Sequence, residues 1–175
     1  MCLDTYGDLT EDVKNELAKG RKTFYKIVWV QKDGLYTSWL DWRQPIKQGW
    51  LRSDRQSVVA GHDSKDVDSY DGYDCWSIYR GIHVICNRTD IFPNIRKMER
   101  DNQWLYNCDD LRYEGEQGLL VAIPVSVSKD DFVAAGRNSY RYDNGAVFMK
   151  VYVPRSSVCI AMAAYRKKFG KTNKK

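Results

Sequence analysis

The segment from Thr23 to Leu40 places the strongest constraint on the fold. Residues 23–31 read TFYKIVWVQ, a run of β-branched and aromatic residues that is typical of a strand. Asp33-Gly34 follows, and LYTSWL then continues from residue 35 to residue 40. An Asp-Gly pair between two such runs predicts a β-hairpin. A hairpin pairs its strands antiparallel, so the sheet that contains it is at least partly antiparallel.

Further strands and helices follow along the chain. We expect strands at 76–86, 119–128 and 146–153, and helices at 11–19, 90–103 and after Pro154. Thr10 is the expected N-cap of the first helix, and a short helical turn is expected to end at Gly136. Pro124 cannot donate a backbone hydrogen bond, so its strand should be an edge or be bulged there. This order predicts an α+β fold, with a mainly antiparallel sheet and three or four short helices.

Length and charge divide the chain into a globule and a tail. A chain of 175 residues favours one domain, which we place at residues 1–165, with an acidic loop at 53–74. Residues 166–175 hold six of the 28 Lys and Arg and no acid, which leaves 22 basic and 23 acidic side chains elsewhere. The globule is therefore almost neutral. Nucleic acid is expected to bind only weakly, through the basic tail.

The cysteines and the apolar runs bear on the compartment and on metals. No two of the five cysteines lie within ten residues of each other, which argues against CxxC metal or redox pairs. Cys86 and Cys159 lie in apolar stretches and are expected in the core. The sequence shows neither a signal peptide nor a membrane-length apolar run, which predicts a cytoplasmic protein without membrane contact. The acidic loop lacks the glutamate that ends a calcium-binding loop, so we predict no metal. The sequence contains neither a P-loop nor a G-x-G-x-x-G motif, so we predict no cofactor.

Aromatic and arginine side chains gather around the hairpin and the loop after it. Tyr, Trp and Arg dominate the binding energy of protein interfaces, and aromatic rings with arginines also stack on nucleotide bases. A protein-binding surface is the first interpretation, and a nucleotide or small-ligand pocket is the second. Core packing is the alternative for each single residue. The predicted binding residues are Tyr36, Trp39, Trp42, Arg43, Trp50, Arg52 and Arg55.

Three segments carry a resemblance to known proteins. GIHVICNRTDIF, VAIPVSVSKDDFVAAG and AVFMKVYVP resemble a group of small bacteriophage-encoded proteins without assigned chemistry, over residues 78–154. The resemblance implies a viral origin and expression in a bacterial cytoplasm. It implies no catalytic residue. Because small phage accessory proteins commonly act by binding host proteins, it favours a binding function.

Candidate catalytic residues are few. His83 is one of two histidines, and it is either a base or pocket donor or a core histidine bonded to the backbone. Tyr79-Arg80-Gly81 followed by Glu114-Gly115-Glu116 resembles the arginine strand and E-x-E loop of ADP-ribosyltransferases. That resemblance implies NAD binding by Arg80 and oxocarbenium stabilisation by Glu116. The chain departs from the family pattern, since Thr37-Ser38 precedes Arg80 rather than following it.

The sequence therefore predicts a phage-derived accessory protein. It is expected to bind a host protein, such as a component of a defence system, and to inhibit or redirect it. The alternatives are a protein that binds and sequesters a nucleotide or small ligand, and an ADP-ribosyltransferase-like enzyme. A binding function is preferred to an enzymatic one.

Overall fold

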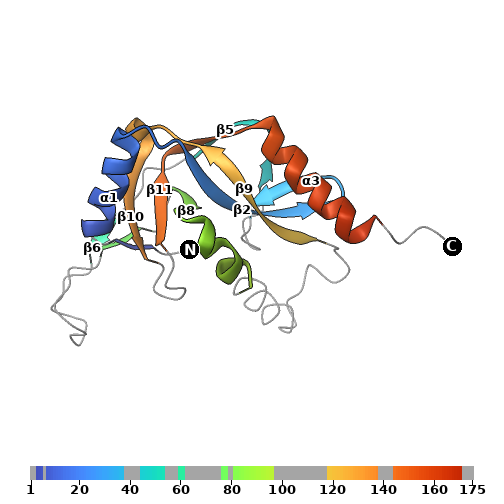
Figure 1. Cartoon of the computed structure of the whole chain (residues 1–175), viewed down its shortest axis with the longest axis horizontal. Coiled ribbons are helices and arrows are strands. Elements are labelled where there is room, and N and C mark those ends of the chain that lie inside the picture. Colours follow the sequence, from blue (N-terminus) through green and yellow to red (C-terminus); the bar gives the residue numbers. More distant parts are fainter. Residues whose placement is uncertain are drawn as a thin grey trace.

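The computed structural model shows an α+β fold with a mainly antiparallel sheet, as the sequence predicts. Helices α1 (Gly7–Ala18) and α3 (Arg155–Phe169) lie at opposite ends of the curved sheet, and a helical segment at 91–96 lies between them (Figure 1). The structure describes residues 3–5, 7–37, 44–53, 59–61, 76–78, 81–96, 118–137 and 144–170. No helix in these ranges is long and apolar enough to cross a membrane.

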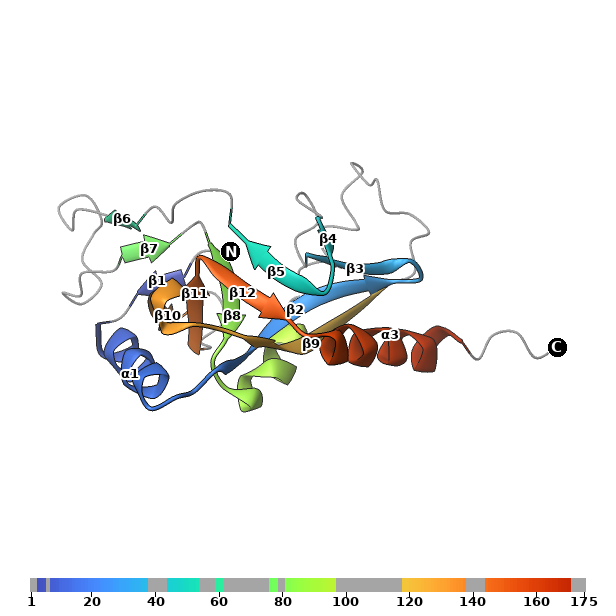
Figure 2. The same ribbon diagram turned by 90° about the horizontal axis from the view of Figure 1, so that it is seen from above.

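The sheet follows the order β5-β12-β9-β2-β8-β11-β10-β1-β7-β6, and β3 and β4 extend it from β2. Every pairing within it is antiparallel. Figure 2 shows this sheet from above, with α1 and α3 at its two ends. The strands are β1 (Leu3–Thr5), β2 (Thr23–Gln31), β3 (Gly34–Thr37), β4 (Pro45–Ile46), β5 (Gly49–Arg52), β6 (Val59–Gly61), β7 (Trp76–Ile78), β8 (Ile82–Ile85), β9 (Leu119–Ser126), β10 (Phe132–Arg137), β11 (Asn144–Phe148) and β12 (Lys150–Val153).

Five of these strands close a circuit of pairings around the main core. β2 pairs with β9 along its length and with β8 at Tyr25. β8 pairs with β11, which continues into β12 after Met149, and β12 returns to β9 at Ser126. The Phe148 ring lies inside the circuit, with its centroid 5.3 Å from that of Phe24 and 5.5 Å from that of Phe132. The circuit therefore encloses an aromatic and aliphatic interior that holds the strands together.

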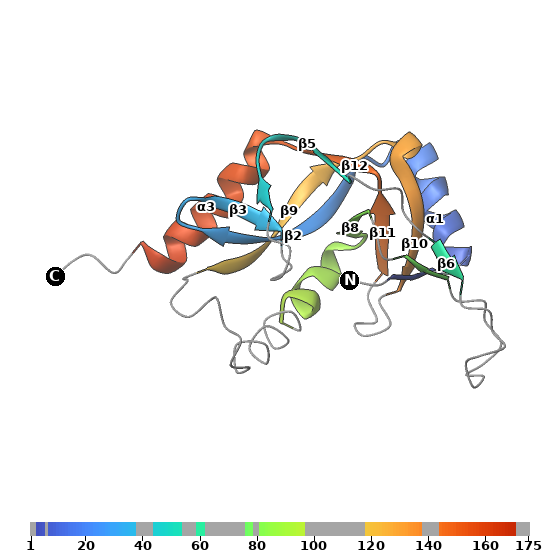
Figure 3. The same cartoon turned by 180° about the vertical axis from the view of Figure 1, so that it is seen from behind.

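A second, smaller core lies on the opposite face of β2. Alternation along the strand sends Phe24 and Val28 into the main core. It sends Ile27 and Trp29 to the second core, where they pack with Ile85 and Leu120. The helical segment 91–96 (green in Figure 3) covers this face through Ile91 and Ile95. The aromatic strand at 23–31 is thus buried on both faces.

Helix α1 begins earlier than the sequence predicts. Thr10 lies inside the helix rather than at its N-cap. Its Oγ1 donates to the carbonyl oxygen of Ala135 at 2.9 Å and accepts from the Ala135 N–H at 3.1 Å. The hydroxyl therefore fastens α1 to β10, a tertiary role that local capping rules do not reveal. Gly20 follows the helix with φ of 95°, as a residue that ends a helix should.

The predicted hairpin is present, but its turn is shifted by one residue. Gln31 pairs with Gly34, so Lys32 and Asp33 form the turn and Gly34 opens β3. The Tyr36 hydroxyl donates to the Asp33 carboxylate at 2.7 Å. The Asp33 carboxylate therefore helps to hold the turn that the Asp33-Gly34 pair predicts.

Several other predicted boundaries were wrong. The single strand expected at 76–86 is two strands, β7 and β8, because Gly81 has a positive φ of 109° that breaks the extended backbone. The helical turn expected to end at Gly136 stops at Asp131, since the residues after it pair with β11 and form β10. Asn144-Gly145, expected as a turn, lies in β11.

Some predictions about burial and the tail also change. Cys86 is buried as expected, but Cys159 is exposed on α3. Residues 166–169 of the predicted basic tail belong to the last turn of α3, while 171–175 lie outside the described residues. Strand β6 falls within the predicted acidic loop. Residues 54–58 and 62–74 of that loop lie outside the described residues.

Candidate functional site

An apolar groove of about 650 Å³ runs between the helical segment 91–96 and α3. Strand β9 passes between these two helices (Figures 1 and 3). The helical walls carry Ile91 and Ile95 on one side and Ile160 and Ala164 on the other. Each pair is four residues apart, so each forms one stripe on its helix. The groove is lined by Tyr25, Arg88, Ile91, Ile95, Leu119, Leu120, Val121, Ala122, Pro124, Ile160 and Ala164.

One edge of β9 forms the floor of this groove. The Val127 N–H donates to the Lys22 carbonyl at 3.0 Å, so the backbone of Val127 faces β2. Alternation then turns the backbone groups of Ser126, Pro124 and the even-numbered residues before them away from β2. On this second edge Ser126 pairs with β12. Among the described residues, no strand pairs with β9 on this edge between residues 119 and 125.

This geometry explains why β9 tolerates a proline. Pro124 has no N–H, and its backbone faces the edge where no ladder needs one. Its carbonyl oxygen accepts a 2.6 Å hydrogen bond from the Oγ of Ser157, in the first turn of α3. The sequence-based expectation that this strand is an edge at Pro124 is therefore correct. The hydroxyl of Ser157 also fixes the wall of the groove to its floor.

Large apolar side chains remain exposed beside the groove. Among the described residues only Trp50, Phe92 and Ile160 are large, hydrophobic and exposed. Ile160 lines the groove and is 49% exposed. Phe92 is 62% exposed and follows Ile91 in the chain, but it is not among the residues that line the groove. Apolar surface that gathers around a hollow is the usual mark of a binding site rather than of random exposure.

The charges near the groove are positive. Arg88 lines it, and none of the described lining residues is acidic. Lys167 and Lys168 follow Ala164 by three and four residues on α3, so they continue the helix face that carries Ala164. The Arg96 guanidinium lies 4.5 Å from the centroid of the Phe92 ring. An apolar ligand with negative groups at its ends matches this arrangement.

The structure describes three of the seven predicted binding residues. Trp50 and Arg52 are exposed on β5, where the Trp50 ring meets Tyr152 edge-on with centroids 5.4 Å apart. Tyr36 is half-buried and packs against the second core. Trp39, Trp42, Arg43 and Arg55 lie outside the described residues. The aromatic surface predicted around the hairpin therefore stays a prediction, with Trp50 as its exposed member.

His83, one of the predicted catalytic candidates, lies on β8 beside a half-buried lysine. The Nζ of Lys26 donates to the carbonyl oxygen of His83 at 3.4 Å. Burial lowers the pKa of Lys26 to about 8. Burial, with a further contribution from the charge of Lys26, lowers the pKa of His83 to about 3. Both nitrogens of the His83 ring are shielded from solvent and have no hydrogen-bond partner.

His83 is therefore a neutral imidazole at physiological pH. The backbone hydrogen bond expected for a core histidine is absent from its ring. Groups of three or more potential metal ligands are also absent from the described residues. The other two catalytic candidates, Arg80 and Glu116, lie outside those residues.

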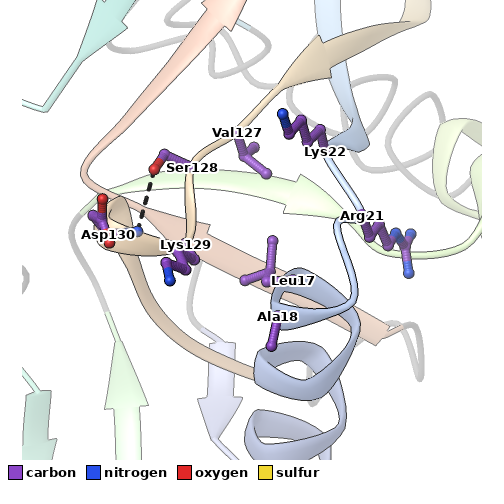
Figure 4. Close-up of a pocket in the computed structure, with 8 residues that line it drawn as sticks. All are labelled: Leu17, Ala18, Arg21, Lys22, Val127, Ser128, Lys129 and Asp130. Atoms are coloured by element: carbon purple, nitrogen blue, oxygen red, sulfur yellow. Dashed lines mark hydrogen bonds between the residues drawn. The ribbon is translucent and has the colours of Figure 1, made fainter.

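A second cavity, of about 410 Å³, lies where α1 meets the turn before β10. Lys22 and Lys129 are exposed at its rim, and the Ser128 hydroxyl accepts from the Asp130 N–H (Figure 4). The Arg21 side chain points away from this turn in the same view. It binds Glu16 and the carbonyl oxygen of Cys86 instead. The lysines also lie near the C-terminal end of α1, where cations offset the helix dipole.

The groove was not predicted from the sequence as a site. Pro124 was the available signal, because a proline inside an apolar strand marks an edge. The residues of the two wall stripes lie more than sixty positions apart along the chain, so only the fold brings them together. Comparison of the chain with protein-family models, with curated proteins and with solved structures found no match.

Proposed function

We propose that this protein binds a partner protein through the groove over β9. The observation that carries the proposal is the exposed apolar side chain of Ile160 on the wall of a groove whose floor is a strand edge that pairs with no other described strand between residues 119 and 125. Burying exposed apolar surface is the main driving force of protein association. Both helical walls of the groove already pack against the sheet, so the fold needs no further helix of this chain in the groove.

The partner that we propose is a protein of the bacterial host that is located in the cytoplasm. This part of the proposal rests on the resemblance of residues 78–154 to phage-encoded proteins, and on the binding role common among such proteins. The segment includes one wall of the groove and its floor. Binding inhibits or redirects the host protein by covering the surface that enters the groove.

Affinity capture from bacterial lysate tests this proposal. We expect the protein to retain a specific host protein, and Ile160→Asp to reduce its recovery at least tenfold, because a carboxylate would have to be buried in an apolar contact. Trp50→Ala is the matched control, since Trp50 is equally exposed but lies on β5. Equal recovery with Ile160→Asp and the unaltered protein would contradict the proposal. Loss with Trp50→Ala alone would favour the aromatic surface predicted from the sequence.

Nucleotide sequestration is the second candidate function. Its supporting observation is the pair of exposed lysines, Lys22 and Lys129, beside the cavity of Figure 4. A ligand that binds only the native state raises the melting temperature. Nucleotides that raise it in the unaltered protein, but not in a Lys22→Ala, Lys129→Ala double variant, would favour this candidate. The ADP-ribosyltransferase-like alternative stays a prediction on Arg80 and Glu116.

A further inference from the structure

We infer that the partner enters the groove as an extended segment that adds a strand to the edge of β9 at residues 119–123, where no described strand pairs. This inference rests on the proposed function and specifies how the partner is recognised. It concerns the backbone of the groove floor, whereas the proposed function concerns the apolar walls. The two can therefore fail separately.

The backbone groups on the floor define a short docking strip. Alternation directs the N–H and the carbonyl of Leu120 and of Ala122 away from β2, in the same direction as those of Ser126. Within the described part of the chain, no strand pairs with either residue on that side. At Pro124 the strip ends, because proline lacks a donor and Ser157 already bonds to its carbonyl oxygen. The two donors and two acceptors of these residues lie at the floor of the groove, where Leu120 is buried and Ala122 is half-buried.

The walls suit the alternating side chains of a strand. Successive side chains of an extended segment point to opposite faces of the sheet. A strand added to β9 would therefore direct alternate side chains toward the stripe of Ile91 and Ile95 and toward the stripe of Ile160 and Ala164. A helix laid in the groove would satisfy its own backbone and leave the groups of Leu120 and Ala122 without new partners. Main-chain pairing with side-chain pockets on both faces is how strand addition achieves affinity and specificity.

The charges specify the ends of the segment. Arg88 lies on one wall, and Lys167 and Lys168 follow the stripe of the other. Opposite charges at the rim steer association and fix register. The occupant is therefore a short apolar, strand-forming segment of a partner protein with acidic residues on either side of it.

Amide exchange in the free protein provides the first test. The N–H groups of Leu120 and Ala122 should exchange with solvent much faster than those of Val121 and Ile123, which face β2. We would then add a peptide of four valines flanked by two glutamates at each end. Saturating peptide should slow the exchange of Leu120 and Ala122 at least tenfold. Peptide binding without this protection would overturn strand addition.

Backbone methylation of the peptide provides the second test. N-methylation at the first and third valine, or at the second and fourth, leaves the side chains unchanged but removes alternate donors. One of these two peptides should bind at least tenfold more weakly than the other, because only alternate residues face β9. Equal affinities would overturn the inference and leave the proposed function in place. No binding by the unmethylated peptide would also overturn it, provided that Ile160→Asp still abolishes capture of the host protein.

A proline in β9 tests the same strip from the other side. Ala122→Pro removes one outward donor and has the same orientation as the existing Pro124, so it should keep the fold. It should lower peptide affinity at least tenfold, whereas Ala122→Val, which keeps the donor, should not. Unchanged affinity of a folded Ala122→Pro variant would overturn strand addition. If that variant fails to fold, the methylated peptides decide the outcome.

Discussion

The hydroxyl of Ser157 donates a 2.6 Å hydrogen bond to the carbonyl oxygen of Pro124 and joins the first turn of α3 to the edge of β9. Ser157 is fully buried. The bond satisfies a carbonyl that lacks a strand partner on its side, and it sets the position of the helix that carries Ile160. The edge, the proline and the wall of the groove are therefore parts of one arrangement.

Replacing Ser157 with alanine should destabilise the protein by about 1–3 kcal/mol, because the part-buried carbonyl oxygen of Pro124 would lose its hydrogen-bond partner. Urea denaturation followed by circular dichroism measures this loss. Ser156→Ala is the matched control, since Ser156 is exposed in the same turn. Equal stability of the two variants would show that the bond to Pro124 does not hold α3.

Gly118 should not accept a side chain. A Cβ at this position would lie 1.9 Å from Cζ2 of Trp29, whose ring packs in the second core. Gly118→Ala should therefore displace the ring and cost about 1–3 kcal/mol, the usual penalty for overpacking. Gly34→Ala is the control, because a Cβ there meets nothing within 4 Å. A Gly118→Ala variant as stable as Gly34→Ala would contradict this contact.

Lys26 should make stability rise with pH in the alkaline range. Burial lowers its pKa from 10.5 to about 8, so between these values the unfolded chain binds a proton that the folded chain has released. Stability from this group therefore increases as the pH rises from 8 to 10.5. Lys26→Met should be more stable than the unaltered protein at pH 7, by up to about 3 kcal/mol. The contribution of the lost hydrogen bond to the His83 carbonyl reduces this gain.

Denaturation at pH 7 and at pH 10.5 measures the effect of Lys26→Met. The advantage of the methionine variant should shrink at the higher pH, where the folded lysine is already neutral. An advantage that stays constant across this range would show that Lys26 keeps its ordinary pKa. Lys47→Met, on an exposed position after β4, is the control for removing a positive charge.

His83 should make stability fall as the solution becomes acidic. Burial lowers its pKa from 6.5 to about 3, so below pH 6.5 the unfolded chain gains a proton that the folded chain refuses. The unaltered protein should lose about 2 kcal/mol between pH 6.5 and pH 5 from this group. His83→Leu should lose less over the same interval. Parallel losses in both proteins, measured by urea denaturation, would argue against a buried neutral imidazole.

The sequence predicts the fold class well because its strongest signals are local. The hairpin at 23–37 follows from two β-rich runs around a turn, and Pro124 alone indicates a strand edge. The capping role expected for Thr10 was wrong because its hydroxyl bonds to Ala135, which is 125 residues away in the chain. The break at Gly81 was missed because glycine also occurs inside continuous strands.

The groove was beyond sequence reasoning for a similar reason. Ile91 and Ile95 form a stripe that periodicity can find, but it cannot show that part of the stripe borders open space. Ile160 looks like a core residue until α3 is docked. The packing of Ala161 and Met162 in the main core, together with the bond between Ser157 and Pro124, fixes which face of α3 turns toward β9. Burial of an individual aromatic residue, as for Tyr36, likewise depends on the register of paired strands.

Helix α3 presents two separate stripes. Ala161 and Met162 pack into the interior of the strand circuit, while Ile160 and Ala164 border the groove. Mutations on the second stripe leave the contacts of Ala161 and Met162 in the main core intact. Substitutions at Ile160 and Ala164 are therefore expected to change the surface of the groove with little loss of stability.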